Sequence, residues 1–308
     1  MGKTQLFVRK QKGGVFTVVN EAVTTGNIYW VDSGKTTTGG DTTGHGSNPD
    51  APFLTIDYAI GRCTANNGDI IYVMPGHAET VAATVGIACD VAGVSIIGLG
   101  VGRSRPAITA HASAIDAISV SVANVHLENL RIIGAASCTA LINLAGADFT
   151  ARDLVLEHGA APVMAVTVAS GGNRFSFRDC VFSATADGPD CGIDIEAGVT
   201  GPWEVIGCDF NYAPYGLDIA GIRSDTKSTE GGVIKYNTFV GMEVAAIDFN
   251  SSSTDGGDGL IAWNTVGAKG AVADIDTLID AGGYCLCQNY GTDTASEGGG
   301  LIPVTTPV

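Results

Sequence analysis

The stretch FSFRDCVF, residues 175–182, contains the pattern that decides the fold. Apolar and polar residues alternate up to Arg178, an acidic residue follows, and a second short apolar segment begins at Cys180. Alternation with a period of two is typical of a β-strand with one buried face. Aspartate tolerates the left-handed backbone conformation of a sharp bend. The stretch therefore predicts two short strands joined by a bend at Asp179.

The same pattern recurs along most of the chain. Related segments begin at residues 125, 149, 203, 233 and 260, and VSIIGLGV from residue 94 fits the same frame. Their bend positions from Asn129 onward are 24 to 30 residues apart. This spacing is too short for a four-stranded propeller blade. It suits one coil of a parallel β-solenoid, in which neighbouring coils lie about 4.8 Å apart.

The bend positions form a predicted structural ladder, because side chains at equivalent positions of stacked coils can hydrogen-bond from coil to coil. A row of catalytic acids is a weaker interpretation, since Asn and Gly occupy the same position. The position after the bend, with Cys180 and Cys208 and later Thr238 and Thr265, is expected to form a buried stack. The predicted ladder comprises Asn129, Asp153, Asp179, Asn237 and Asn264, with Gly207 at the equivalent bend position.

A second family of short strands interleaves with the first and includes IDIEAG from residue 193, LDIAGI from 217 and IDFNSS from 247. Aligning its members places one Asp at the same outward position of three successive coils. Stacked carboxylates repel each other, which can raise the pKa of one of them. Carboxylates about 5 to 9 Å apart also match the geometry of glycoside hydrolysis. If the protein is an enzyme, the expected catalytic residues are Asp194, Glu196, Asp218 and Asp248.

A solvated acidic face is the preferred interpretation of the same column. Outward strand positions must be polar, and acidic side chains there discourage strands from pairing with other chains. Binding of Ca²⁺ and contact with a neighbouring subunit are the alternatives. No Lys or Arg follows Asp194 or Asp218 closely enough to resemble a lyase base, and Arg223 is the nearest. We therefore expect no enzymatic activity from this face.

The sequence indicates no cofactor and no dedicated metal site. Gly34-Lys35-Thr36 lacks the upstream glycine of a phosphate-binding loop. None of the five histidines pairs with Cys, Asp or Glu at a recognised metal-binding spacing. We also expect no membrane partner, since no apolar run approaches the 18 or more residues of a membrane span.

Charge is distributed unevenly along the 308 residues, whose net charge is −16. Residues 1–12 carry four basic side chains and no acid, so the rest of the chain carries −16 − 4 = −20. An acidic body argues against nucleic-acid binding, whereas a basic arm suits docking to an acidic partner surface. The candidate contact residues in this arm are Lys3, Phe7, Arg9, Lys10 and Lys12.

We expect four segments along the chain. Residues 1–27 form the basic arm, and residues 28–67 form a first strand, a Gly-rich loop and an amphipathic cap helix over 52–65. A cap is expected because the open end of a solenoid exposes apolar core and unpaired strand edge. Residues 68–285 form the coils. Residues 286–308 lack a coil pattern and form an extended tail.

The opening motifs PDAPFLTIDYAI, GDIIYVMPG and VSIIGLG follow an aromatic strand and a Gly-rich loop. This order resembles the start of pectate-lyase-like proteins encoded by bacteriophages, over roughly residues 28 to 290. The resemblance implies an all-β, right-handed parallel β-helix with an N-terminal capping helix and extended terminal arms. That fold hosts lyases, hydrolases, tailspikes and inert virion proteins alike.

The resemblance also implies a virion structural protein, made in the host cytoplasm and assembled as a homotrimer. A short arm, compact coils and a short tail favour a capsid decoration protein on the outer surface of the head. Its partner would be the major capsid protein, and its role would be to stabilise the head. The alternative is a tailspike-like protein that binds or cleaves a polysaccharide as a lyase or hydrolase.

Overall fold

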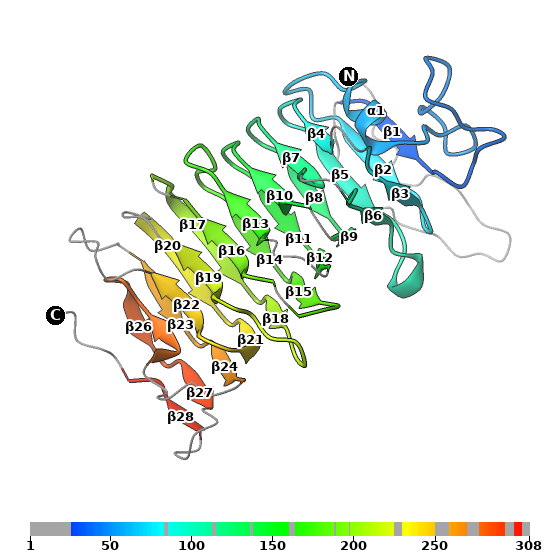
Figure 1. The fold of residues 1–308 in the computed structure, drawn as a ribbon. Helices are drawn as coiled ribbons and strands as arrows, with labels where there is room; N and C mark the ends of the chain where they lie inside the picture. Colours follow the sequence, from blue (N-terminus) through cyan, green and yellow to red (C-terminus); the bar gives the residue numbers. More distant parts are fainter. Residues whose placement is uncertain are drawn as a thin grey trace, which may run out of the picture.

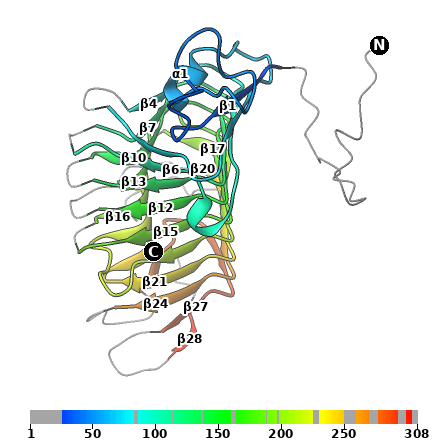
Figure 2. The ribbon, with the colours of Figure 1, turned by 90° about the vertical axis from the view of Figure 1, so that its right-hand side faces the viewer.

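The computed structural model describes residues 26–303, apart from 83–85, 113–114, 136–137, 160–163, 188, 197, 225–229, 250–258, 270–276 and 293–298. It is a parallel β-solenoid, in which the chain winds through three sheets in turn (Figure 1). The coils stack on one another along the length of the molecule (Figure 2). This is the fold class that the repeat pattern predicts.

Sheet 1 has ten strands, and sheet 2, which follows it in each coil, also has ten. The strands of sheet 1 are β1 (Ile28–Val31), β2 (Ile70–Val73), β5 (Ser95–Gly98), β8 (His126–Glu128), β11 (Thr150–Arg152), β14 (Ser176–Arg178), β17 (Thr200–Ile206), β20 (Glu230–Lys235), β23 (Leu260–Ala262) and β26 (Cys285–Cys287). Those of sheet 2 are β3 (Ala78–Thr80), β6 (Ala107–Thr109), β9 (Arg131–Ile133), β12 (Val155–His158), β15 (Val181–Ala184), β18 (Asp209–Asn211), β21 (Thr238–Met242), β24 (Thr265–Ala268), β27 (Tyr290–Thr292) and β28 (Gly299–Leu301).

Sheet 3 has eight strands and completes each coil. Its strands are β4 (Ile87–Cys89), β7 (Ile118–Val120), β10 (Ala140–Leu144), β13 (Met164–Val168), β16 (Cys191–Ile195), β19 (Ala220–Ser224), β22 (Ala245–Phe249) and β25 (Ile279–Asp280). Coil-to-coil pairing is parallel, apart from β28, which runs antiparallel to β27.

The core lies inside the solenoid and consists of stacked columns of like side chains. Phe182, Phe210 and Phe239 occupy the same inward position of sheet 2, with ring centroids 4.3 and 4.6 Å apart. Ile193 and Ile195 of sheet 3 are also buried. Burying a Phe or Ile side chain contributes roughly 1.5–3 kcal/mol. Strand alternation therefore places one apolar column inside for each polar column outside.

The helix at the N-terminal end is shorter than the predicted 52–65. Helix α1 (Ile56–Ile60) begins at the N-cap Thr55, whose hydroxyl accepts a hydrogen bond from the Tyr58 amide at 3.4 Å. Phe53 instead pairs with the first strand, its amide lying 2.8 Å from the Trp30 carbonyl. After α1 the chain turns through Asn66 and Gly68, both in the left-handed conformation, and such residues do not continue a helix.

The coils extend past the predicted boundary at residue 285. Strands β26 and β27 continue sheets 1 and 2 to Thr292, so the expectation of a patternless tail from residue 286 was wrong for this stretch. Leu286 points into the core there. In the same coil Cys285 is exposed and Cys287 is half-buried. Among the described residues, no helix has the length and hydropathy of a membrane span.

Candidate functional site

The column of carboxylates predicted on sheet 3 contains a basic residue in place of Asp218. Strand register pairs Asp194 with Arg223, and Arg223 with Asp248 and then Asp280 beyond it. The predicted run of three stacked acids was therefore wrong. Strand β19 begins at Ala220, and Asp218 lies in the turn before it, since the turn that follows β18 is longer than the repeat suggests.

Arg223 changes the electrostatics of this column. Its Nε atom lies 3.0 Å from Asp194 Oδ1, and the two side chains are only 13 and 17 % exposed. Opposite charges on neighbouring coils attract each other, so the repulsion expected between stacked acids is replaced by an ion pair. Glu196, the other predicted catalytic residue, is exposed just beyond the end of β16. The column has the character of a surface ion-pair stack.

Asp218 belongs instead to a second group of acids, at the corner where sheet 2 leads into sheet 3. We call this group the acidic corner, and it consists of Asp187, Asp190, Asp218 and Glu243 with Lys269. Partial burial, followed by the negative charges of Glu243, Asp190 and Asp187, raises the pKa of the exposed Asp218 carboxyl. A carboxyl of this kind can donate a proton at a higher pH than an ordinary Asp.

Backbone hydrogen bonds hold the acidic corner together. The Asp218 amide donates to the Pro189 carbonyl at 3.1 Å, and the Ile219 amide donates to the Asp190 carbonyl at 3.0 Å. Lys269 Nζ lies 2.7 Å from Glu243 Oε1 and also donates to the Tyr215 carbonyl. Adjacent coils thus bring their acids together, and one lysine offsets part of the repulsion.

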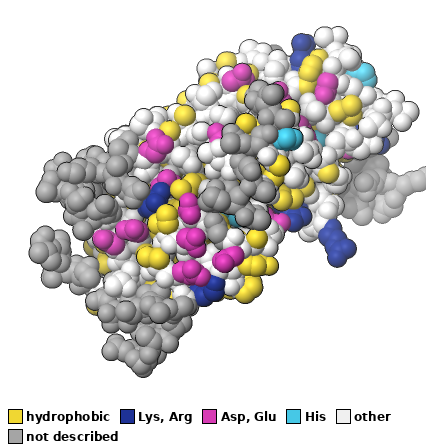
Figure 3. Space-filling model, viewed as in Figure 1, with side chains coloured by type: hydrophobic (Ala, Val, Ile, Leu, Met, Phe, Trp, Pro, Cys, Tyr) yellow, Lys and Arg dark blue, Asp and Glu magenta, His cyan; other side chains and the backbone are white. Residues whose placement is uncertain are grey.

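The acidic corner and the Asp194 column together form what we call the acidic face. Asp190 directly precedes β16, and Glu243 lies just before β22. Figure 3 shows Asp and Glu side chains gathered on this side of the molecule, with a few Lys or Arg side chains among them. The face therefore offers many hydrogen-bond acceptors and a negative potential.

The predicted structural ladder divides into two adjacent columns. Asn129, Asp153 and Asp179 have positive φ angles of 54°, 51° and 54°, so they occupy the bend as predicted. In the later coils the bend is formed by other residues, and Asn237 and Asn264 lie one position further on, inside the core. We call the bend positions the corner column, which comprises Asn129, Asp153, Asp179, Gly207, Tyr236, Trp263 and Gln288.

The inner column contains the actual coil-to-coil ladder. Asn237 Nδ2 donates to Asn264 Oδ1, and Asn264 Nδ2 donates to Asn289 Oδ1, each at 3.0 Å. These asparagines follow Cys180 and Cys208, which are buried as predicted. Thr238 and Thr265 were wrongly assigned to this stack, because they begin β21 and β24 one residue later and are exposed.

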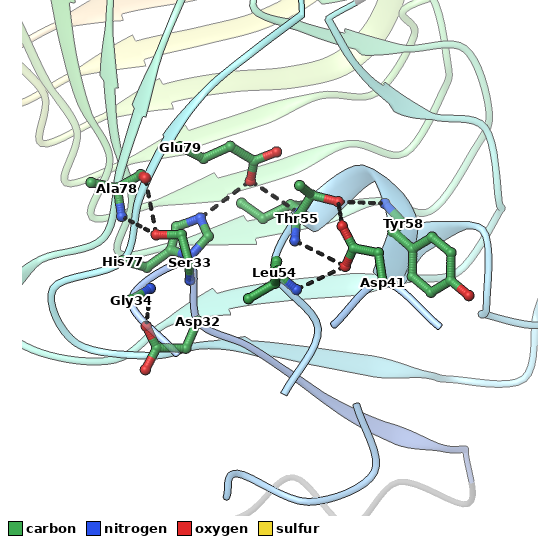
Figure 4. A network of polar contacts seen from close by, with 11 residues as sticks. Asp32, Ser33, Gly34, Asp41, Leu54, Thr55, Tyr58, His77, Ala78 and Glu79 are labelled. Atoms are coloured by element: carbon green, nitrogen blue, oxygen red, sulfur yellow. Dashed lines mark hydrogen bonds and ion pairs between the residues drawn. The ribbon is translucent and has the colours of Figure 1, made fainter. Parts of the chain in front are cut away.

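A serine, a histidine and a glutamate also meet near the N-terminal cap, in the network of Figure 4. Ser33 contacts His77 through its backbone amide, which lies 3.0 Å from Nδ1. Its hydroxyl is engaged by the Ala78 backbone, donating to the carbonyl and accepting from the amide, each at 2.9 Å. His77 Nε2 lies 3.2 Å from Glu79 Oε2. The Ser33 hydroxyl thus bonds the Ala78 backbone and not the His77 ring as in a catalytic triad, and the network fastens the loop after β1 to the first coil.

Sequence reasoning missed three charged members of the candidate site and two exposed aromatic side chains. Arg223, Lys269 and Glu243 join the candidate site through strand register, which a single sequence does not display. Tyr236 and Trp263 could have been found, because an aromatic next to Asn at the end of an alternating strand is unusual on a solvated bend. The described part of the chain holds no group of three or more His, Cys, Asp or Glu side chains placed to bind a metal ion.

The fold resembles that of known polysaccharide-active proteins. A pectate lyase, Pel9A, superposes with a TM-score of 0.52 at 13 % identity, covering 89 % of this chain and 78 % of the lyase. A pectin methylesterase in complex with a hexasaccharide gives a TM-score of 0.52 at 14 % identity, covering 90 % of this chain and 92 % of the esterase. This chain has the pectate-lyase-like fold. At such low identity the likeness concerns the fold alone.

The sequence itself matches no protein-family model and no curated protein. The pectate-lyase-like fold supports many activities, so the function must be argued from the surface of this chain.

Proposed function

We propose that this protein binds a polysaccharide along its acidic face, as a tailspike-like β-helix protein. The observation that carries the proposal is the acidic corner, where four carboxylates of successive turns meet on an exposed surface. Carboxylate oxygens accept hydrogen bonds from sugar hydroxyls. A solenoid repeats such groups about every 4.8 Å, so several sugar units can be engaged in a row.

The fold likeness supports this proposal more than it supports capsid decoration. The two similar proteins are by name a lyase and an esterase of pectic polymers. The decoration hypothesis depends on the basic arm, whose candidate residues Lys3, Phe7, Arg9, Lys10 and Lys12 lie outside the described residues. We keep the arm, residues 1–27, as the proposed attachment segment of a virion protein. A homotrimer is part of the same proposal.

Cleavage of the bound polysaccharide is the second candidate function, favoured by one observation. The pKa of Asp218 is raised, first by partial burial and then by Glu243, Asp190 and Asp187, and a general acid in glycoside hydrolysis needs a raised pKa. Asp190 is the carboxylate that would activate water, because Glu243 is paired with Lys269. In this mechanism Asp218 protonates the leaving oxygen while Asp190 acts as the base.

The test measures binding and cleavage separately. The full chain is titrated by calorimetry with cellohexaose, maltohexaose, xylohexaose and chitohexaose, and release of reducing ends is followed in parallel. If the acidic corner binds sugar, Asp218→Asn combined with Asp190→Asn should weaken binding at least tenfold, since each change replaces a charged hydrogen bond worth about 1.5–3 kcal/mol by a neutral one worth about 0.5–1.5 kcal/mol. Asp153→Asn, a half-exposed acid on the corner column, is the matched control.

Three outcomes decide between the candidates. Binding without release of reducing ends supports a binding protein, whereas release that Asp218→Asn abolishes supports hydrolysis. If none of the hexasaccharides binds to the wild-type chain, the proposed function is wrong. Deleting residues 1–25, which spares the Asn27 contact with Asp69, should leave glycan binding unchanged and abolish attachment to virions.

A further inference from the structure

The corner column lacks a side chain at Gly207. Every other position of this column from Asn129 to Gln288 is occupied by a residue with a side chain, although all have φ between 50° and 59°. Gly207 has φ 68°, in the same region. A left-handed residue with a side chain costs about 1–2 kcal/mol, and this column accepts that cost at its other positions. Backbone geometry therefore does not require the glycine, whose missing side chain leaves a space that the Asp179 carboxylate enters from one side.

An aromatic ring faces this space. The rings of Tyr236 and Trp263 are stacked with an interplanar angle of 10° and centroids 5.2 Å apart, which is close to the coil spacing of about 4.8 Å. Trp263 Nε1 donates to Gln288 Oε1 at 2.6 Å, which fixes the indole. Since Trp263 covers one face of Tyr236, the other face points towards the level of Gly207. Tyr236 is 56 % exposed.

Polar groups border the same space. A Cβ atom at Gly207 would lie 2.9 Å from Asp179 Oδ1, so this carboxylate leans over the glycine from the preceding coil. Arg152 Nε lies 3.8 Å from Asp179 Oδ2 and orients it. Lys235 Nζ lies over the Tyr236 ring, 5.9 Å from its centroid, and moves to the edge of the ring when another ring packs on that face. We call this space, bordered by Asp179, Gly207, Lys235 and Tyr236, the Gly207 notch.

The dimensions of the Gly207 notch suit one ring. Asp179 and Tyr236 are two coils apart, or about 9.6 Å at the usual spacing of parallel strands. A ring at the level of Gly207 would then lie about 4.8 Å from the layer on each side, close to the 5.2 Å between the centroids of Tyr236 and Trp263. Such a ring would continue the stack of Tyr236 and Trp263 by one member.

We propose that the Gly207 notch binds one pyranose ring of a neutral or amine-bearing polysaccharide. The apolar C–H face of the sugar packs on Tyr236, its hydroxyl or amino groups donate to Asp179, and Lys235 donates to a sugar oxygen. The choice of a sugar over other ring compounds rests on the proposed function. An anionic ring such as a nucleotide is disfavoured by a net charge of −16.

The experiment fills the notch or removes its wall. Gly207→Asn places in the notch a side chain that the same column carries at Asn129, and Tyr236→Ala removes the stacking face. With the hexasaccharide that binds the wild-type chain most tightly among cellohexaose, maltohexaose, xylohexaose and chitohexaose, we expect both variants to bind about five- to tenfold more weakly. Tyr236→Phe keeps the ring and should bind like the wild type. Tyr290→Ala removes an exposed tyrosine outside the corner column and should also change nothing.

The outcomes separate this inference from the proposed function. If the wild type binds and Gly207→Asn binds equally well, the notch proposal is overturned while polysaccharide binding stands. A loss caused by Tyr290→Ala as large as that caused by Tyr236→Ala also overturns it. If the wild type binds no hexasaccharide, both proposals fail. Thermal unfolding checks each variant, and should Tyr236→Ala not fold, Gly207→Asn and Tyr236→Phe still decide.

Discussion

At the scale of the residue, Asn264 shows how a buried amide can fix the position of a coil. Its side chain accepts from the Asn237 amide and from Asn237 Nδ2, and donates to Asn289 Oδ1 and to the Ile234 carbonyl. The residue is fully buried. A buried polar group without a partner costs about 1–3 kcal/mol, so the members of such a row depend on each other.

Asn264→Ala should therefore lower the free energy of unfolding by about 2–4 kcal/mol, because it leaves several buried groups unpaired at once. Urea denaturation followed by circular dichroism measures the change. Asp153→Asn, at a half-exposed position of the corner column, is the control and should stay within about 0.5 kcal/mol of the wild type. Equal losses in the two variants would contradict a role for the inner ladder.

The backbone conformation of the corner column also depends on the buried asparagines of the inner column. Tyr236 and Trp263 adopt left-handed φ angles of 59° and 54°, which bulky residues seldom do. The ladder asparagine that follows each of them is buried and bonded, so the backbone conformation before it is imposed by the coil. Tyr236 and Trp263 therefore adopt the left-handed conformation because the buried asparagine that follows each of them fixes the chain there.

At the scale of the element, the sequence predicted strands and coils well and register less well. Period-two alternation and a bend every 24 to 30 residues are local signals, and the structure has both. The error at Asn237 arose because asparagine suits both a left-handed bend and a buried ladder. Asp218 was misplaced because LDIAGI resembles IDIEAG, although the strand begins at Ala220. Two similar motifs can each look like the strand, and pairing with the next coil decides between them. That pairing joins residues far apart in the sequence, so a local pattern does not reveal it.

The first coil depends on a buried carboxylate that joins three elements. Asp69, just before β2, accepts from the Asn27 amide at 2.6 Å, the Thr64 amide at 2.6 Å and Asn67 Nδ2 at 2.7 Å. Burial alone raises the pKa of this carboxyl, but the hydrogen bonds from Thr64, Asn27 and Asn67 outweigh it and lower the pKa below its ordinary value. Asp69 therefore fastens the start of β1 and the turn after α1 to β2.

A lowered folded-state pKa means that Asp69 stabilises the fold above the unfolded pKa of about 3.9, and that this contribution is lost as the pH falls through the folded pKa. Asp69→Asn removes the charge and places a donor opposite the Thr64 amide. We expect it to destabilise the protein by about 1–3 kcal/mol at pH 7. Thermal unfolding between pH 7 and pH 3 should show the difference from the wild type shrinking with acidity. A difference that stays constant over this range would rule out ionised Asp69 as the cause.

At the scale of the whole molecule, charge restricts the choice of polymer. The net charge is −16, and the acidic corner adds a local concentration of carboxylates on an exposed surface. The similar structures include a pectate lyase, and pectate is itself a polyanion. A chain of uronates would meet repulsion here along its whole length. The fold is shared with a pectin-active protein, whereas the surface charge favours a neutral or cationic polymer for the binding that we propose.

Ionic strength tests this restriction. Hexagalacturonate should bind at least tenfold more weakly than the best neutral hexasaccharide at about 0.01 M salt, where charges interact over roughly 30 Å. The gap should narrow at about 0.5 M salt, because the Debye length then falls below 8 Å. Affinity for the neutral sugar should change little, since no net charge is brought to the surface.

The methyl ester of hexagalacturonate is the matched control, as it keeps the backbone and loses the charge. Tighter binding of the acid than of its ester at low salt would show that the acidic face does not select the polymer, and would move the site to Arg152 and Lys235, the basic side chains next to the corner column.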